Sequence, residues 1–246
     1  MRLNAVRVYF YGDLSLFLAR RGAASISVQL AGDRVSIKDL VESLGVPHTE
    51  IDALFVNDRA VGFSHRISGN KRVRVYPDAS RVRFAGVKKL RPTNPHKPAF
   101  LVDVHLGKVA RMLRLLGFDT VFDPALDDTG IIDAAVKSRR IILTRDKGIL
   151  KQRRVRYGYY VRGDSLTERM RGIVRRYDLT GKIKPFARCV GCNGRLRRVR
   201  KERVLSELEP LTRRYYDEFY RCISCGKIYW EGSHHPRILA FIKNIT

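Results

Sequence analysis

The sequence predicts a protein of the mixed α/β class with three structured parts. Three observations support this prediction. Strand-like and helix-like segments alternate between residues 99 and 177, an order typical of a parallel sheet covered by helices. Residues 1–79 instead predict several strands around one short helix. All four cysteines stand in two Cys-x-x-Cys pairs near the end of the chain. The expected domains are 1–79, 99–182 and 183–246, with residues 80–98 as a linker.

The N-terminal part has one predicted helix among its strands. The helix, residues 36–45, begins at Ser36 as N-cap and ends at Gly45. The predicted strands are residues 2–10, residues 25–30, the two arms of a hairpin over 55–61, and residues 71–76. This order resembles the β-grasp fold of ubiquitin and of the small sulfur-carrier proteins.

Sulfur-carrier chemistry is excluded for this ubiquitin-like part. Such carriers act through a free C-terminal Gly-Gly, whereas here the last strand ends in Pro77-Asp78-Ala79 and the chain continues. Two roles remain open for it: a docking module for a protein partner, or a structural cap.

Positive charge is concentrated in the part of the chain that follows residue 79. The chain carries 49 Lys and Arg against 24 Asp and Glu, a net charge of +25. Residues 1–79 hold 11 basic and eight acidic residues, so residues 80–246 hold 38 and 16. The linker alone has six basic residues, three prolines and no acid. Because each neutralised phosphate releases counterions, this segregation favours a nucleic acid as the partner over a general solubilising charge or an anionic membrane surface.

The sequence also predicts a cytoplasmic location without a membrane span. No apolar run approaches the roughly 18 residues that a spanning helix needs. The first ten residues lack the apolar core of a secretion signal.

The middle part alternates regularly between strand and helix. The helix after the first strand places its apolar side chains on one face, and Gly117 follows it as a C-cap. The predicted strands are 99–102, 120–122, 141–144 and 157–161. The predicted helices are 105–116, 129–138, 147–152 and 165–177. Ligands of such sheets bind beyond the carboxyl ends of the strands, so a site is expected there.

Acidic residues follow these strand ends. Asp103, Asp146 and Asp164 each come after a predicted strand, and Asp128 begins a helix on the same edge. Gathered carboxylates repel one another unless a divalent cation neutralises them, and Mg²⁺ and Mn²⁺ prefer such oxygen ligands. We therefore predict Asp103, Asp128 and Asp146 as catalytic metal ligands for phosphodiester hydrolysis. Asp127 and Asp164 are additional candidates, and a helix cap for Asp128 or a turn for Asp164 is the plainer alternative.

Four other residues of this part receive simpler interpretations. Asp119, Asp123 and Asp133 are expected to be structural. Arg145 stands next to Asp146 and either contacts the scissile phosphate or pairs with an acid.

Several motifs spread over the chain point to one nuclease family. They are Phe100–Thr120, Asp127-Asp128, Ile141–Asp146, the paired cysteine motifs and Tyr229–His234. Together they resemble the Mut-seven-C ribonucleases, which belong to the PIN-like nucleases. The resemblance implies a PIN-like fold, metal-dependent ribonuclease activity and a zinc ribbon, and a fused N-terminal ubiquitin-like domain is a known arrangement in this family. Asp103, Asp128 and Asp146 match the family's acids well.

The cysteine pairs, Cys189 with Cys192 and Cys222 with Cys225, predict a zinc ribbon. Two Cys-x-x-Cys motifs on glycine-bearing turns are typical of a Zn(Cys)₄ site. The 29 residues between the pairs leave room for an inserted hairpin or helix. Two disulfides are the alternative, which a cytosolic chain disfavours.

Basic side chains C-terminal to the linker are the predicted RNA contacts. One stripe lies along the helix after Asp103, and a second is the stretch 195–203, with six basic residues in nine. Tyr and Phe residues interleaved with Arg and Lys further on suit stacking against single-stranded RNA, although Trp230 is assigned to the ribbon core. The predicted RNA-binding residues are Lys108, Arg111, Arg114, Arg145, Arg195, Arg197, Arg198 and Arg200.

The favoured hypothesis is a Mg²⁺- or Mn²⁺-dependent endoribonuclease that grips RNA with basic helices and a zinc ribbon. The alternative is a non-catalytic RNA- or ribosome-binding protein with a vestigial acid cluster. The sequence does not distinguish tRNA, rRNA or mRNA as the target.

Overall fold

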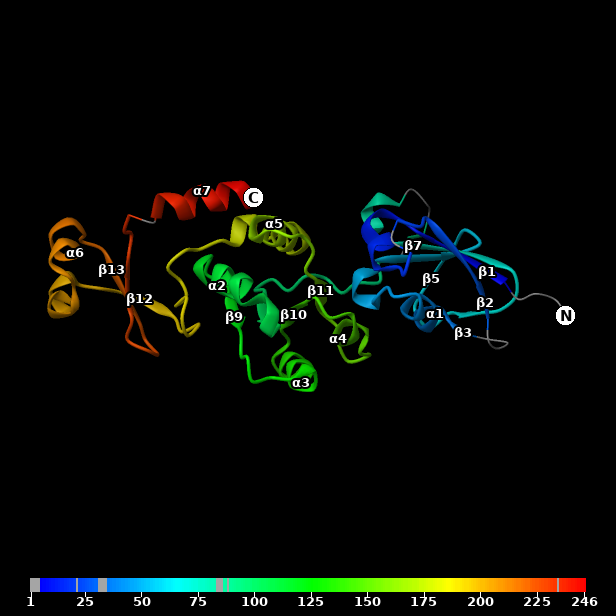
Figure 1. The fold of residues 1–246 in the computed structure, drawn as a ribbon, viewed down its shortest axis with the longest axis horizontal. Coiled ribbons are helices and arrows are strands. Elements are labelled where there is room, and N and C mark those ends of the chain that lie inside the picture. The colour runs from blue at the N-terminus through cyan, green and yellow to red at the C-terminus, as the bar shows by residue number, and fades with distance from the viewer. Residues whose placement is uncertain (1–4, 21, 31–34, 83–85, 88, 234) are drawn as a thin grey trace. The chain divides into compact units, whose positions relative to one another are not determined.

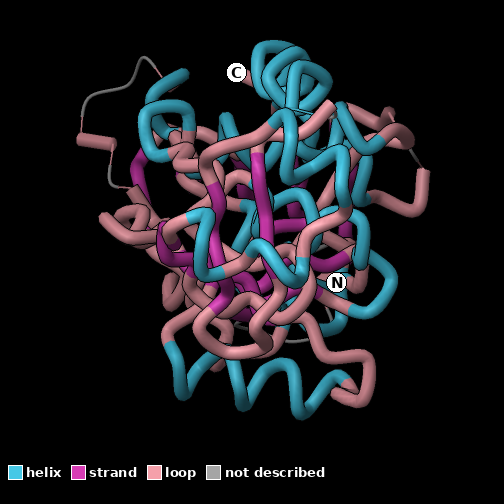
Figure 2. The backbone as a smooth tube through the Cα atoms, turned by 90° about the vertical axis from the view of Figure 1, so that its left-hand side faces the viewer, coloured by secondary structure: helices cyan, strands magenta, loops and turns pink. Residues whose placement is uncertain are grey.

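The computed structural model describes residues 5–246 except 21, 31–34, 83–85, 88 and 234 (Figure 1). Parts of the predicted first strand and linker, and His234 of the last motif, therefore lie outside the described residues. The chain divides into two compact units. The first is 1–93 with 146–160, and the second is 94–145 with 161–246. Helices and strands occur together throughout, which confirms the mixed α/β class (Figure 2).

A five-stranded sheet in the order β2-β1-β7-β4-β5 organises the first unit. The central strands β1 and β7 are parallel, and the remaining neighbours are antiparallel. A separate antiparallel pair joins β3 to β6. The strands are β1 (Ala5–Phe10), β2 (Ser25–Gln29), β3 (Val35–Ser36), β4 (Ala53–Val56), β5 (Arg59–Val61), β6 (Arg66–Ile67) and β7 (Lys71–Tyr76). This arrangement confirms the predicted β-grasp class.

Local sequence explains the helix and the hairpin of this sheet. Helix α1 (Ile37–Ser43) starts where Ser36 Oγ accepts the N–H of Asp39 at 3.1 Å. It buries apolar side chains in the same core as β1 and β7. Asn57 and Asp58 both have positive φ, 46° and 69°, as the tight turn between β4 and β5 requires.

A segment from the middle of the chain packs in this first unit. It contains α4 (Lys147–Lys151) and β11 (Gly158–Tyr160). Lys147 Nζ donates to the carbonyl of Phe17 at 3.0 Å. The buried Glu50 accepts the N–H of Tyr160 at 2.7 Å, and His48 Nε2 lies 3.0 Å from the carbonyl of Val155. The predicted domain boundaries, which assign this segment to the nuclease part, remain a prediction.

The middle part of the chain forms a parallel sheet of the second unit in the order β10-β8-β9. Strand β8 (Ala99–Val102) pairs in parallel with β10 (Ile141–Thr144) and with β9 (Asp119–Val121). The helices of the second unit that follow its strands are α2 (Gly107–Leu115), α3 (Asp128–Ser138) and α5 (Leu166–Tyr177), and each buries one apolar face. The structure thus confirms a parallel sheet with helices.

The C-terminal part is a small antiparallel sheet in the order β12-β13-β14. Its strands are β12 (Leu196–Val199), β13 (Phe219–Cys222) and β14 (Ile228–Trp230), and α6 (Pro210–Tyr215) lies in the insertion between the cysteine pairs. Val204, Leu208 and Phe219 form its core, against which Trp230 packs half-buried, as expected. Helix α7 (His235–Ile245), which the sequence analysis did not predict, packs on α5 through hydrogen bonds from Arg171 to the carbonyl of Asn244.

Among the described residues, the helices are too short or too polar to cross a lipid bilayer.

Candidate active site and zinc centre

Asp103 is a buried acid at the end of a central strand. It directly follows β8, and the residue is 5% exposed. Its Oδ2 accepts a hydrogen bond of 2.5 Å from Thr144 Oγ1, at the end of β10, and its Oδ1 accepts the N–H of His105 at 3.3 Å. Burying a carboxylate is costly without such partners. Two neighbouring parallel strands therefore hold this side chain in place.

Asp146 stands two residues beyond Thr144 and caps α4. Its exposed carboxylate accepts the backbone N–H groups of Gly148 and Ile149, the latter at 3.2 Å. A glycine at position 148 leaves room for this cap, because a Cβ there would lie only 2.9 Å from Asp146 Oδ1. The sequence predicted a strand-end acid here, and the structure adds its role as an N-cap.

The adjacent acids at the start of α3 have different positions. Asp127 is the N-cap, and its Oδ1 accepts the N–H of Gly130 at 2.7 Å. Asp128 is exposed in the first helical turn. The cap role considered for Asp128 therefore belongs to Asp127, and Asp128 presents its carboxylate to solvent.

Asp164 lies in the turn before α5. It is exposed, and its backbone N–H donates to Glu168 Oε2 at 2.9 Å. Ser165 and Glu168 form a capping box that starts the helix. This position agrees with the turn role that the sequence allowed for Asp164.

The predicted carboxylate ligands are not gathered as closely as the cysteines. In the described part of the chain, the one group of three or more His, Cys, Asp or Glu with ligand atoms within 4.8 Å of one another consists of the four cysteines. The assignment of Asp103, Asp128 and Asp146 as metal ligands stays a prediction.

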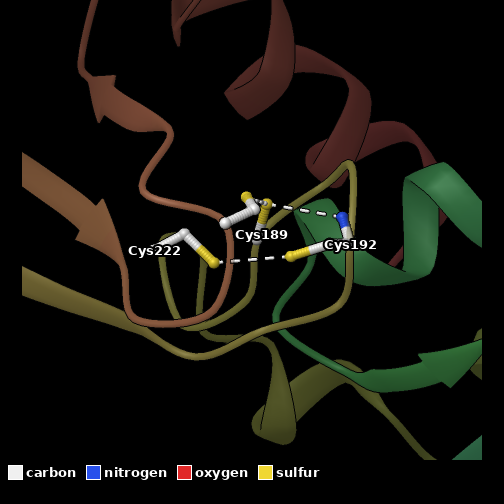
Figure 3. Close-up of side chains that lie close together, drawn as sticks. Cys189, Cys192 and Cys222 are labelled. Carbon is white, nitrogen blue, oxygen red and sulfur yellow. Dashed lines mark hydrogen bonds between the residues drawn. The ribbon is translucent and has the colours of Figure 1, made fainter.

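The four cysteine sulfurs converge on one point (Figure 3). The Sγ atoms of Cys189 and Cys225 are 3.7 Å apart, those of Cys192 and Cys222 are 3.4 Å apart, and no disulfide joins them. Zn–S bonds of about 2.3 Å at tetrahedral angles separate sulfurs by about 3.8 Å. The backbone N–H of Gly194 lies 3.4 Å from Cys192 Sγ. The donor set and its spacing fit a structural zinc ion.

The surroundings of Cys189 favour the thiolate that a metal ligand needs. Burial alone would raise the pKa of this thiol. The backbone N–H of Cys192 and the hydroxyl of Tyr229, 3.0 Å from the sulfur, lower that pKa to about 6. A thiol with so low a pKa loses its proton easily when a metal binds.

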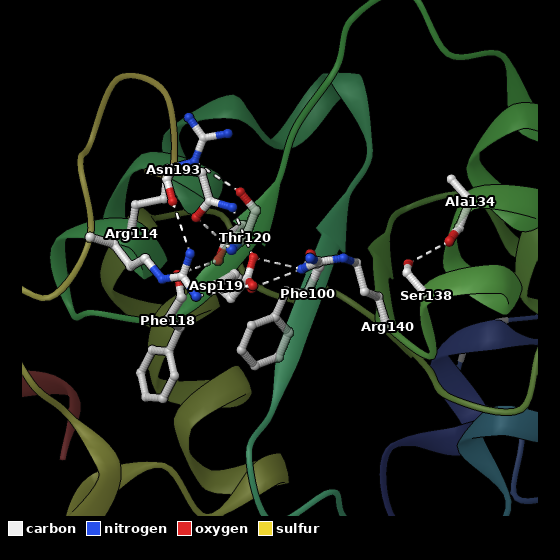
Figure 4. Close-up of polar contacts among 10 residues, drawn as sticks. Phe100, Arg114, Phe118, Asp119, Thr120, Ala134, Ser138, Arg140 and Asn193 are labelled. Carbon is white, nitrogen blue, oxygen red and sulfur yellow. Dashed lines mark hydrogen bonds and ion pairs between the residues drawn. The ribbon is translucent and has the colours of Figure 1, made fainter. Parts of the chain in front are cut away.

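Arg114 attaches the first cysteine turn to the parallel sheet (Figure 4). The residue is 7% exposed. Its Nε donates to the carbonyl of Thr120 at 2.9 Å, and its Nη1 donates to that of Gly191 at 2.6 Å. The sequence pattern predicted an RNA contact for Arg114, whereas these bonds commit its guanidinium to carbonyls of the protein itself.

Asp119 completes this attachment. It accepts hydrogen bonds from Arg140 Nη1 at 2.8 Å, Asn193 Nδ2 at 2.8 Å and Arg188 Nη2 at 3.1 Å (Figure 4). Burial would raise the pKa of Asp119, but the bonds from Arg140 and Asn193 outweigh burial and lower it. The structural role expected for Asp119 is confirmed, although its partners, far away in the sequence, carried no local signal.

Three of the predicted RNA-binding residues, among them the buried Arg114, line a basic pocket beside α2. The pocket has a volume of about 700 Å³, and Lys108, Arg111 and Arg169 contribute charged side chains to it. Lys108 and Arg111 are exposed, and Phe122 adds an aromatic wall. Its lining begins at His105, two residues after Asp103.

The comparisons with known proteins agree with this architecture. A family described as Mut7-C RNAse domain matches residues 98–242, and one described as Mut7-C ubiquitin matches residues 3–83. The chain belongs to the Mut7-C ribonuclease family. No curated protein and no solved structure matches it significantly. The Mut7-C match covers the parallel sheet, its acids and all four cysteines, so the ribonuclease domain includes the four-cysteine site.

The remaining predicted RNA contacts of the Mut7-C domain differ in their surroundings. Arg145 is exposed and donates to the carbonyl of Gly163 at 3.2 Å. Arg198 forms a 2.5 Å ion pair with Glu218, which offsets its charge. Three further arginines on or next to β12 are exposed: Arg195, Arg197 and Arg200.

Proposed function

We propose that this Mut7-C protein is an endoribonuclease that depends on Mg²⁺ or Mn²⁺, with Asp103, Asp128 and Asp146 as its catalytic acids. The observation that carries the proposal is the carboxylate of Asp103, held at a strand end where it accepts the N–H of His105, a residue that lines a basic pocket of the ribonuclease domain. A buried acid at the carboxyl end of a central parallel strand occupies the usual place of a catalytic residue in such sheets.

The three acids have distinct positions in this proposal. Asp103 is fixed by Thr144, and Asp146 follows Thr144 by two residues. Asp128 is exposed at the start of α3, where its carboxylate is able to reach an ion in solution. These carboxylates would hold the divalent ion, which when bound would supply a nucleophilic water and neutralise charge on the phosphate.

RNA binding in this proposal uses the basic pocket and the ribbon. Lys108 and Arg111 would hold backbone phosphates next to Asp103, because both are exposed cations in one hollow. Arg195, Arg197 and Arg200 would extend the grip along β12. A cytoplasmic location belongs to the proposal as well, since thiolates stay reduced there.

One observation favours the alternative, a non-catalytic RNA-binding protein. The carboxylate of Asp146 caps a helix and that of Asp103 accepts a hydrogen bond from the hydroxyl of Thr144, so both acids already have structural partners. In that case the acids would stabilise the fold, and RNA would bind without being cut.

Cleavage of labelled RNA by the zinc-loaded full-length protein separates the two functions. Structured and single-stranded RNAs are incubated with Mn²⁺ or Mg²⁺, and with neither ion. Asp103→Asn, Asp128→Asn and Asp146→Asn are each expected to lower the cleavage rate at least about 100-fold while RNA binding is kept. Asp133→Asn is the matched control, because Asp133 is an exposed acid on the same helix as Asp128. Tight binding without cleavage by the wild type would favour the alternative.

A further inference from the structure

A second pocket lies in the C-terminal part of the second unit, and none of the predicted catalytic acids lines it. Its volume is about 680 Å³. Its walls come from α6, from β14, from the start of α7 and from the segment 185–196. This volume lies within the range of about 300–1,000 Å³ that is usual for sites of small organic ligands.

Aromatic rings dominate the lining of this ribbon pocket. They belong to Phe186, Tyr215, Tyr216, Tyr229 and Trp230. Tyr215 is 65% exposed, and the other four are half-buried. A small domain that needs its rings only for its core would bury them more completely. Partly exposed rings around a hollow indicate a surface that contacts a flat, apolar group.

Phe186 is held at the pocket wall by an unusual backbone conformation. Its φ is 59°, in the left-handed region that a bulky side chain rarely adopts. The ring stacks on Tyr220, with centroids 5.0 Å apart and planes 17° apart. It also lies 5.8 Å from the ring of His235. Strain of this kind persists where surrounding contacts impose it, and it is enriched at binding sites.

The charge around the pocket is positive. Arg188, Lys227 and His235 line it, and none of its described lining residues is an Asp or Glu. Arg188 is paired with Asp119, so Lys227 is the described lining cation that remains for a ligand. Lys227 Nζ lies 6.0 Å above the ring of Tyr229, and the guanidinium of Arg214 lies 5.6 Å from that of Tyr215. Glu231 Oε2 lies 3.4 Å from His235 Nδ1. Residues 183–246 as a whole hold 14 basic and six acidic residues.

We propose that the ribbon pocket binds an unpaired nucleobase of an RNA strand. The base would stack on the rings of Tyr215 and Phe186, and its flanking phosphates would lie against Lys227 and Arg214. Stacking of this kind accepts any base, because every base has an aromatic face. Bases in an RNA duplex are already stacked and paired, so the pocket would select single-stranded or looped segments. The inference rests on the proposed function for RNA as the ligand, and it adds the class of RNA and the residues that choose it.

Fluorescence of a base analogue tests this proposal directly. The probe is a single-stranded RNA of about 12 nucleotides that carries one 2-aminopurine, whose emission falls when it stacks. The zinc-loaded protein is titrated into this RNA in the absence of Mg²⁺ and Mn²⁺, and the 2-aminopurine fluorescence is followed. Binding is thereby measured apart from cleavage. The same RNA annealed to its complement serves as the duplex probe.

The variants separate stacking from folding and from charge. Tyr215→Ala removes an exposed ring, Tyr215→Phe keeps it, and Phe186→Leu keeps apolar bulk without an aromatic face. Leu239→Ala is the control, because Leu239 is an exposed apolar residue of α7 that does not line the pocket. We expect Tyr215→Ala and Phe186→Leu to weaken binding of the single strand about tenfold and to reduce its quenching. Tyr215→Phe and Leu239→Ala should match the wild type, and duplex binding should not change.

Two results would overturn the proposal. If single-strand affinity and quenching are unchanged in Tyr215→Ala and Phe186→Leu, the pocket holds no base and its apolar lining serves another partner. If single-strand and duplex affinities fall equally, the residues act through general electrostatics. Neither result depends on cleavage, because the binding titration contains no Mg²⁺ or Mn²⁺. A failure of the nuclease proposal is detected in the separate cleavage assay, in which the RNA would stay intact in the presence of Mn²⁺.

Discussion

Thr144 Oγ1 donates a hydrogen bond of 2.5 Å to Asp103 Oδ2, and this bond joins the ends of two neighbouring parallel strands. Both residues are buried, with Thr144 fully so. The Thr144 hydroxyl provides a hydrogen-bond donor to a carboxylate oxygen that is buried away from water. The pair links the stability of the sheet to the orientation of the predicted catalytic acid.

Thr144→Val is expected to weaken both properties. The valine keeps the shape but removes the donor, which leaves a buried carboxylate oxygen short of a partner and costs about 1–3 kcal/mol. Urea unfolding should show this loss, and the RNA cleavage rate should fall with it. Thr144→Ser, which retains the hydroxyl, should recover most of the cleavage rate. Equal unfolding free energies for wild type and Thr144→Val would show that the bond contributes nothing.

Arg114 and Arg111 lie one turn apart on α2 and should respond differently to loss of charge. Arg114→Met is expected to lower the unfolding free energy by about 2–4 kcal/mol and to speed zinc release, because the carbonyls of Thr120 and Gly191 lose their donor.

Arg111→Met should leave stability within about 0.5 kcal/mol, because Arg111 is exposed. It should weaken RNA binding and make the slope of log affinity against log salt shallower by about 0.7 for each phosphate that the variant no longer binds. Salt titrations of RNA affinity and denaturant unfolding of both variants make the comparison. An Arg114→Met protein with unchanged stability and weaker RNA binding would restore the RNA-binding role that the sequence predicted.

The pKa of Asp119 predicts a loss of stability in acid. Its folded pKa is lower than the ordinary value of 3.8, so the carboxylate contributes stability above that value. The contribution is lost as the pH falls through the lower, folded pKa. Wild type should therefore lose more unfolding free energy than Asp119→Asn when the pH drops from about 6 to about 3. Parallel pH profiles for the two proteins would exclude Asp119 as the source.

Zinc removal should unfold the ribbon before the rest of the chain. The purified protein is expected to contain one zinc ion per chain, measured by elemental analysis, since the four thiolates form one site. A strong chelator should abolish hydrogen-exchange protection in residues 189–230 and leave the β-grasp sheet protected. Cys222→Ser should have the same effect. A metal-free protein that keeps this protection would contradict the zinc assignment.

The segment 146–160 is expected to exchange its amide hydrogens together with the β-grasp unit. Lys147, Val155 and Tyr160 all have partners there. Glu50→Met removes the buried carboxylate that accepts the N–H of Tyr160, and it should speed exchange in β11. Asp58→Asn, in the same unit but paired with Arg72 and Arg74, is the comparison variant. If exchange of 146–160 is unchanged in Glu50→Met, the segment is held by other contacts.

Regular local patterns allowed much of the fold to be predicted from the sequence. The strands at 71–76, 99–102 and 141–144 agree with the observed bounds, because alternating or continuous apolar residues end there at proline or acids. The capped helix α5 and the four-cysteine site also follow from short motifs with one physical meaning.

Features that depend on distant partners were not predictable in this way. Arg114 lies in a basic stripe that is typical of an exposed surface, yet Val190 and Gly191, over 70 residues away, bury it. The packing of 146–160 with the β-grasp unit likewise depends on residues about 100 positions earlier. The ribbon pocket brings together rings from 186 to 230 that share no local period. Tertiary contacts decided each of these cases.

The decisive measurement for metal-dependent catalysis by Asp103 is the single-turnover rate of RNA cleavage against Mn²⁺ concentration, for wild type and Asp103→Asn. We expect the wild-type rate to rise with Mn²⁺ to saturation, and the rate of Asp103→Asn to be at least about 100-fold lower at equal RNA occupancy. Equal rates for the two proteins, or a wild-type rate independent of Mn²⁺ and Mg²⁺, would contradict metal-dependent catalysis by Asp103.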